Sequence, residues 1–190
     1  MSIHIFRVAV AGMILATTTI SPVFAEDAKT PLTELDAATT DLMKGLDDNQ
    51  LRQLGSIQNG HGIIRAVEDV QQSIARAVES CAKENPDMKG GMSSRFEAWK
   101  DAVRPVMKDA RKRLDKMILL QSFAQPSEVR AYLKKFDAAV IFRNQGVKAV
   151  PVKEKSACEA LQKSMDKTQD NMAKMLTEAL GLNSDIQIKE

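Results

Sequence analysis

Two cysteines, Cys81 and Cys158, are the residues whose chemistry most restricts this chain. They lie 77 positions apart, so there is no C-x-x-C motif of a dithiol redox centre and no C-x-x-C-H motif for covalent haem attachment. In an oxidising compartment two cysteines usually form a structural disulfide. One alternative is a reactive pair, because Cys158 falls in the first turn of a predicted helix whose dipole favours the thiolate. The other alternative is two free buried thiols.

Histidine chemistry in this chain depends on a single residue. Of the two histidines, His4 lies in a predicted export signal and His61 lies between Gly60 and Gly62. We expect these glycines to place His61 in an exposed turn. The sequence has no H-E-x-x-H, phosphate-loop or EF-hand motif and no recognisable Ser-His-Asp set. These observations predict a protein that is not an enzyme.

Methionines could serve either a metal or the core. Met172 and Met175 are three residues apart and Met165 precedes them by seven, so their thioethers would share one helix face that could bind Cu(I). Methionine at such positions, like Met107 and Met117, is also ordinary core filling because its side chain is flexible. A third interpretation is an adaptable groove for client proteins. We predict no cofactor, with copper, non-covalent haem or another small molecule in the bundle interior as the alternative.

Positive charge is concentrated in one part of the chain. The 27 Lys and Arg nearly balance the 25 Asp and Glu, but residues 100–155 hold fourteen basic and six acidic side chains. The densest run predicts a basic helical face made of Arg104, Lys108, Arg111, Lys112, Arg113 and Lys116. Such a face suits lipid headgroups, lipopolysaccharide phosphates or acidic proteins, and the alternative is a solvated face balanced by the acidic residues 26–99. Nucleic acid is not expected, because of the compartment and because no aromatic residues interleave with these cations.

The N-terminus has the pattern of a secretory signal peptide over residues 1–25. Arg7 precedes an apolar run of about 13 residues, and Ala25 ends a cleavage site of small and apolar residues. Because about 20 residues are needed to span a bilayer as a helix, we expect no transmembrane anchor. The pattern predicts export to the periplasm, or secretion as the alternative, and a single mature helical domain over residues 26–190.

Apolar residues recur at helical spacing through the mature chain. The expected helices run from Pro31 to about Leu54 with a break near Gly45, from about Gly62 to Lys83, from Ser94 to Gln121, from Pro126 to about Gln145 and from Ser156 to Leu180, with 183–190 as a frayed tail. Capping boxes are expected at Ser94 and Ser156. The seam of the third helix comprises Phe96, Trp99, Val103, Val106, Ala110, Leu114, Met117 and Gln121, and Pro105 should kink this helix.

These helices predict an all-α, up-and-down bundle of four main helices plus an N-terminal helix. If the four main helices alternate in direction, the end of one cysteine-bearing helix and the start of the other lie at the same end of the bundle. Cys81 and Cys158 would then face each other. A disulfide closing this loop would stabilise the fold by about 4 kcal/mol in the chain-entropy model.

The function expected from these features is that of an exported, non-enzymatic envelope protein that binds a protein or an anionic envelope component through the basic face. The segment Leu32-Thr33-Glu34-Leu35-Asp36 matches an L-T-x-x-Q motif except for aspartate in the last position. In export, helicity and lack of catalytic residues, the chain resembles small helical periplasmic stress chaperones of the Spy class, whose hallmark is that repeat. The resemblance implies a periplasmic chaperone-like role as a further alternative.

Overall fold

Five α-helices and one short 3₁₀ turn make up the described residues, 29–147 and 150–182, of the computed structural model. The helices are α1 (Pro31–Met43), α2 (Asp48–Glu84), α3 (Lys89–Leu120), α4 (Pro126–Gln145) and α5 (Lys155–Leu180), with the 3₁₀ turn η1 (Pro86–Met88) between α2 and α3. The predicted signal peptide over 1–25 and the predicted tail over 183–190 lie outside the described residues. The predicted all-α bundle is confirmed.

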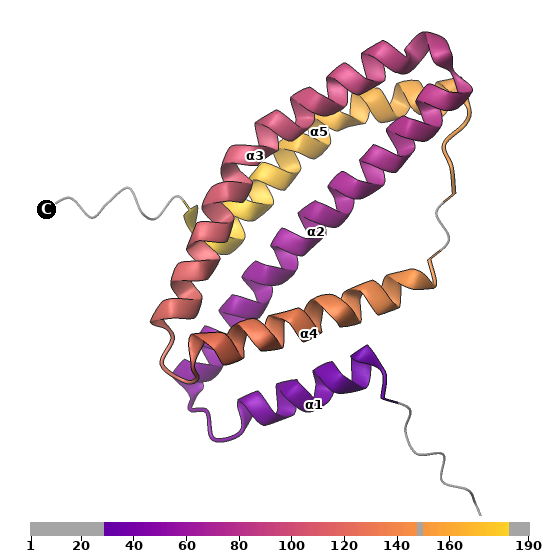
Figure 1. The fold of residues 1–190 in the computed structure, drawn as a ribbon. Coiled ribbons are helices and arrows are strands. Elements are labelled where there is room, and N and C mark those ends of the chain that lie inside the picture. The colour runs from indigo at the N-terminus through magenta and orange to yellow at the C-terminus, as the bar shows by residue number, and fades with distance from the viewer. Residues whose placement is uncertain (1–28, 148–149, 183–190) are drawn as a thin grey trace, which may run out of the picture.

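The bundle is built around three long helices, α2, α3 and α5, which pack against one another along much of their length (Figure 1). α3 and α5 both begin at the end of the bundle where α2 finishes, so they run parallel to each other and antiparallel to α2. The largest fully buried side chains between them include Trp99 and Met92 from α3, Ile57 from α2 and Met165 from α5.

The buried stripe of α3 follows a longer repeat than the sequence predicted. Its members are Met92, Phe96, Trp99, Val103, Met107, Ala110, Leu114 and Ile118, so Met107 and Ile118 take the places predicted for Val106 and Met117. Residues 92, 103 and 114 are each 11 apart, a repeat of about 3.67 residues per turn, whereas the predicted seam assumed the heptad value of about 3.5. The buried stripe therefore departs from the predicted seam at Met107 and again at Ile118.

α4 packs mainly on α1 and much less on the three long helices, so the two short helices form a separate pair at one end of the bundle (Figure 1). The first half of α4 buries Val129 and Leu133 in the core, whereas Ile141 near its C-terminus is 52% exposed. The Tyr132 hydroxyl lies 3.2 Å from Thr39 Oγ1 of α1 and accepts a hydrogen bond from Gln58 Nε2 of α2 at 2.5 Å. Tyr132 thus ties both short helices to α2.

The predicted break near Gly45 is confirmed. Gly45 has φ +75°, a conformation that disfavours residues with a Cβ, and Asp47 then caps α2 by accepting hydrogen bonds from the backbone of Asn49 and Gln50 at 2.8 and 2.9 Å. Gly181 ends α5 in the left-handed conformation, as expected from its position.

The sequence predicted one helix ending at about Leu54 and the next beginning at about Gly62, and this separation was wrong, because α2 continues through Gly55, Gly60 and Gly62 as one helix. Gly60 is buried, and a Cβ on it would lie 2.7 Å from Leu180 Cδ2. The glycine therefore allows α5 to approach α2 closely, and tertiary packing outweighs the low helix propensity of glycine.

The starts of two helices also differ from the prediction. α3 begins at Lys89, directly after η1, and not at Ser94. α5 begins at Lys155 with no side-chain cap.

α3 runs without interruption through Pro105, which is exposed.

The predicted disulfide is present between the last turn of α2 and the first turn of α5. Cys81 and Cys158 are fully buried, with Cα atoms 5.8 Å apart and an S–S distance of 2.07 Å. Lys155 Nζ contacts Asp87 Oδ2 at 2.6 Å at the same end of the bundle. The disulfide and this ion pair connect the α2–η1 turn to the start of α5.

Candidate functional site: the outer side of α3

The six predicted basic residues lie on α3, but they do not form one face. At about 100° per residue, Arg104, Lys108, Arg111, Lys112 and Lys116 fall within a sector of roughly 140° on the outer side of the helix, and all five are exposed. Arg113 points to a different side and is partly buried. We call the five exposed residues the α3 basic face.

Ion pairs neutralise part of this face. Arg104 Nη2 contacts Asp101 Oδ1 at 2.6 Å, Lys112 Nζ contacts Asp109 Oδ1 at 3.8 Å, and both pairs lie within α3. Among residues 29–147 and 150–182, Lys108 and Lys116 form no ion pair. An excess of positive charge thus remains on the α3 basic face after its internal pairs are formed.

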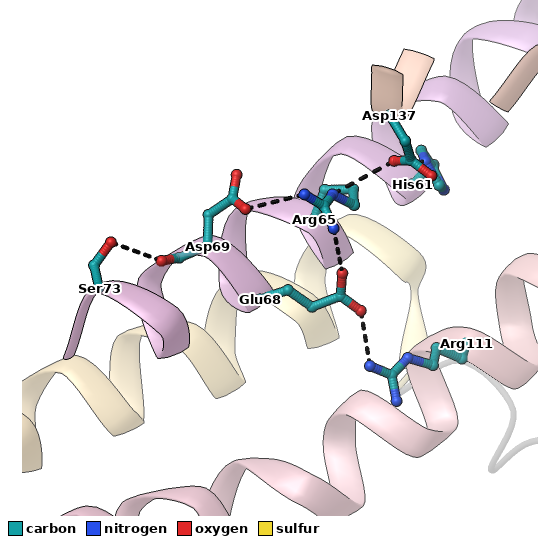
Figure 2. A network of polar contacts seen from close by, with 7 residues as sticks. All are labelled: His61, Arg65, Glu68, Asp69, Ser73, Arg111 and Asp137. Atoms are coloured by element: carbon teal, nitrogen blue, oxygen red, sulfur yellow. Dashed lines mark hydrogen bonds and ion pairs between the residues drawn. The ribbon is translucent and has the colours of Figure 1, made fainter. Parts of the chain in front are cut away.

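Arg111 belongs to a polar network that joins α2, α3 and α4 (Figure 2). Its Nη2 contacts Glu68 Oε1 of α2 at 2.8 Å, and the other oxygen of Glu68 accepts a hydrogen bond from Arg65 Nη1 at 3.1 Å. Arg65 also contacts Asp69 at 3.1 Å on the same helix and Asp137 of α4 at 3.4 Å. Charges alternate along the network, so each cation lies next to a carboxylate.

His61 is placed differently from the prediction. It lies within α2 and not in a turn, its side chain is only 14% exposed, and its Nε2 lies 2.8 Å from Asp137 Oδ1 (Figure 2). The Phe136 ring packs edge-on against the imidazole, with centroids 5.5 Å apart. The Asp137 carboxylate therefore contacts both His61 and Arg65, and these two contacts hold α4 against α2.

A hollow lies at the end of the bundle where α2 begins and α3 ends. Its volume is about 760 Å³, and its cationic lining residues are Arg52, Arg113 and Lys116. The lining carboxylate is Asp47, which already caps α2. Arg113, which was predicted as part of the basic face, thus lines this hollow instead. Lys116 lines the hollow and also belongs to the α3 basic face.

A second, wider hollow of about 1190 Å³ lies between the flank of α2, the end of α4 and the segment leading to α5. Its apolar lining includes Ile141, Val147 and Val150, which are 52%, 72% and 87% exposed. Its charged residues have both signs, with Arg76 and Lys83 beside Glu79 and Glu84. This mixture indicates no single class of ligand.

The methionines considered as copper ligands, and those considered as core residues, lie in the packed interior. Met107 and Met165 are buried, and Met117, Met172 and Met175 are partly buried against the same core. The described residues contain no group of three or more His, Cys, Asp or Glu side chains that could hold a metal ion.

One ion pair near the disulfide shifts the titration of both its partners. The hydrogen bond from Lys155 lowers the pKa of Asp87 below its ordinary value, and the same bond raises the pKa of Lys155. Both side chains are exposed, and the pair connects η1 to the first turn of α5 at the end of the bundle.

No helix in the described part of the chain is long and apolar enough to cross a membrane. Comparison with known proteins finds no matching protein family, no similar curated protein and no similar solved structure.

The sequence analysis did not identify three residues of these sites. Arg52 lines the hollow of about 760 Å³, and Arg65 and Asp137 belong to the polar network that joins α2, α3 and α4. Arg65 and Asp69 have the i, i+4 spacing of a helical ion pair, which is a signal that the sequence contains. Asp137 of α4 contacts His61 of α2, which is 76 positions away in the sequence, and no local sequence pattern predicts this contact.

Proposed function

We propose that this protein is an exported, non-enzymatic binding module that holds an anionic component of the cell envelope on the α3 basic face. The supporting observation is the excess of positive charge on this face, where Lys108 and Lys116 form no ion pair with the described residues. Their positions are eight residues apart, which corresponds to about 12 Å along the helix. A molecule carrying several phosphates or carboxylates could contact both.

The paired cations of this face also remain accessible to such a partner. Arg104 and Lys112 pair with carboxylates on their own helix, and the side chains of both pairs are more than 60% exposed. Exposed pairs of this kind contribute at most about 1 kcal/mol to stability. Exchange of Asp101 or Asp109 for the partner's anion would therefore cost little.

Arg111 has a different role, because Glu68 is itself held by Arg65. The Arg111 side chain is thus oriented by α2 while remaining 57% exposed. We regard it as an oriented cation at the edge of the face, next to Lys108 and Lys116, which form no ion pair with the described residues.

The α3 basic face can be tested with long-chain inorganic polyphosphate, a soluble polyanion. The double variant Lys108→Glu and Lys116→Glu should weaken polyphosphate binding by about tenfold or more, and raising the salt concentration should weaken wild-type binding. The matched control is Lys163→Glu with Lys167→Glu, which changes the net charge equally at exposed positions on α5. Equal losses in both double variants would contradict a localised site, and no binding by the wild-type protein would overturn the proposal.

Export is a separate part of the proposal and is supported by the sequence pattern of residues 1–25. The intact mass of the protein recovered from its native host should correspond to a chain beginning at Glu26. A mass that includes residues 1–25 would contradict export by cleavage of this segment.

A further inference from the structure

Two neighbouring leucines are exposed where α3 ends. Leu119 is 59% exposed and Leu120 is 72% exposed, although the preceding Ile118 is buried in the core at 2%. Single exposed leucines are normal on protein surfaces, but these two successive leucines, about 100° apart around the last turn of α3, expose apolar surface over much of that end of the helix. Such surface is a candidate for contact with another apolar phase.

Charged residues of both signs border these leucines. Lys116 precedes Leu120 by one helical turn, whereas Asp115 precedes Leu119 by one turn and pairs with Arg130 of α4 at 3.5 Å. Leu120 lines the hollow of about 760 Å³ together with Arg52, Arg113 and Lys116, and the carboxylate in that lining, Asp47, accepts two backbone hydrogen bonds at the start of α2. Arg52 and Lys116 by themselves outnumber this carboxylate, so the lining of the hollow carries a net positive charge. Its volume lies in the range of about 300 to 1,000 Å³ that holds small ligands, which is enough for a lipid headgroup.

Exposed leucines beside a hollow with a net positive lining are complementary to the surface of an anionic bilayer. Apolar side chains enter the boundary between headgroups and acyl chains, and each Lys or Arg near the surface contributes about 1 kcal/mol through the negative potential of anionic lipids. Free phosphate would use the cations but not the leucines. A neutral apolar partner would use the leucines but not the cations.

We infer that the partner of this protein is an anionic phospholipid bilayer, and that the protein docks through its leucine end, which comprises Arg52, Arg113, Lys116, Leu119 and Leu120. This inference rests on the proposed function, because it names the source of the anions that the α3 basic face would bind. Lys116 belongs to both surfaces, and Lys112 and Lys108 follow it at about 6 and 12 Å along the helix. The charge screening length in physiological salt is about 8 Å, so the attraction to the bilayer is strongest at Lys116 and decreases toward Lys108.

The test is co-sedimentation with vesicles of phosphatidylglycerol and phosphatidylethanolamine, compared with vesicles of phosphatidylcholine alone. The variant is Leu119→Ser with Leu120→Ser, and both positions are exposed, so the fold should persist; circular dichroism checks this. The control is Ile141→Ser with Val150→Ser, which removes comparably exposed apolar side chains at the other hollow. We expect wild-type and control to bind the anionic vesicles, and the leucine variant to bind at least about tenfold more weakly while retaining wild-type affinity for polyphosphate.

Other outcomes separate this inference from the proposed function. If the wild-type protein binds polyphosphate but no vesicles, or if the leucine variant binds vesicles like the wild type, the docking inference is overturned while the proposed function stands. Equal binding to phosphatidylcholine vesicles would also overturn it, because charge would then have no role. If the wild-type protein binds neither vesicles nor polyphosphate, the docking inference and the proposed function are both overturned.

Discussion

His61 Nε2 lies 2.8 Å from Asp137 Oδ1, and this contact joins α2 to α4. Arg65, one turn further along α2, approaches the same carboxylate oxygen at 3.4 Å. Because α4 otherwise packs mainly on α1, Asp137 is a principal polar link between the short-helix pair and the three long helices. Asp137 is also connected to Arg111 through two intervening residues, Arg65 and Glu68, so the position of α4 and the edge of the α3 basic face depend on one network (Figure 2).

Asp137→Asn should loosen α4 from α2. The substitution removes the charge shared by His61 and Arg65, and a charge-assisted hydrogen bond at a partly exposed site contributes about 1 kcal/mol. We expect the free energy of unfolding in urea to fall by about that amount, with faster amide hydrogen exchange in α4. Asp166→Asn is the control, because Asp166 pairs with Arg95 but is 76% exposed and should matter less. An equal effect of the two substitutions would contradict the role assigned to Asp137.

Removing the disulfide should be the most costly of the changes considered. In the chain-entropy model, a bond across a separation of 77 residues stabilises the fold by about 4 kcal/mol. Urea unfolding of Cys81→Ala with Cys158→Ala should show a loss of that order, and the wild-type protein with reductant should show a similar one. If a thiol reagent labels both cysteines of the unreduced native-source protein after unfolding, the bond does not form there.

The Asp87–Lys155 pair should make a small contribution to stability that depends on pH. The pKa of Asp87 is lowered from its ordinary value of 3.8, so its contribution is complete above that value and is lost as the pH falls through the lower pKa of the folded state. The raised pKa of Lys155 means that its contribution disappears only in strong base. Asp87→Asn should therefore be slightly less stable than wild type at neutral pH, and the difference should disappear as the pH falls through the lowered pKa of Asp87. A difference that persists unchanged in acid would have another origin.

The sequence predicted those features that depend on local patterns. The buried positions of Trp99 and Val103 follow from helical spacing, and the break at Gly45 follows from turn-forming residues. The Cys81–Cys158 bond was predicted from the alternating directions of the helices, which hold for α2, α3 and α5. Of the six cations that the sequence predicted as one basic face, five share one side of α3 and Arg113 does not. The rest depends on contacts between distant segments. No local signal could place His61 beside Asp137, direct Arg113 into the hollow at the end of the bundle, or turn α4 toward α1.

Gly55 and Gly60 provide a direct test of whether local propensity or tertiary packing determines the path of α2. Both are helical, but a Cβ at Gly55 would meet nothing within 4 Å, whereas a Cβ at Gly60 would lie 2.7 Å from Leu180 Cδ2. Gly55→Ala should stabilise the protein by about 0.5 to 1 kcal/mol, the usual helix-propensity gain. Gly60→Ala should gain less, because Leu180 must move, and Gly60→Val should destabilise by about 1 to 3 kcal/mol through overpacking. Thermal and urea unfolding would measure all three. Equal gains at the two positions for alanine would mean that α5 does not approach α2 at Gly60.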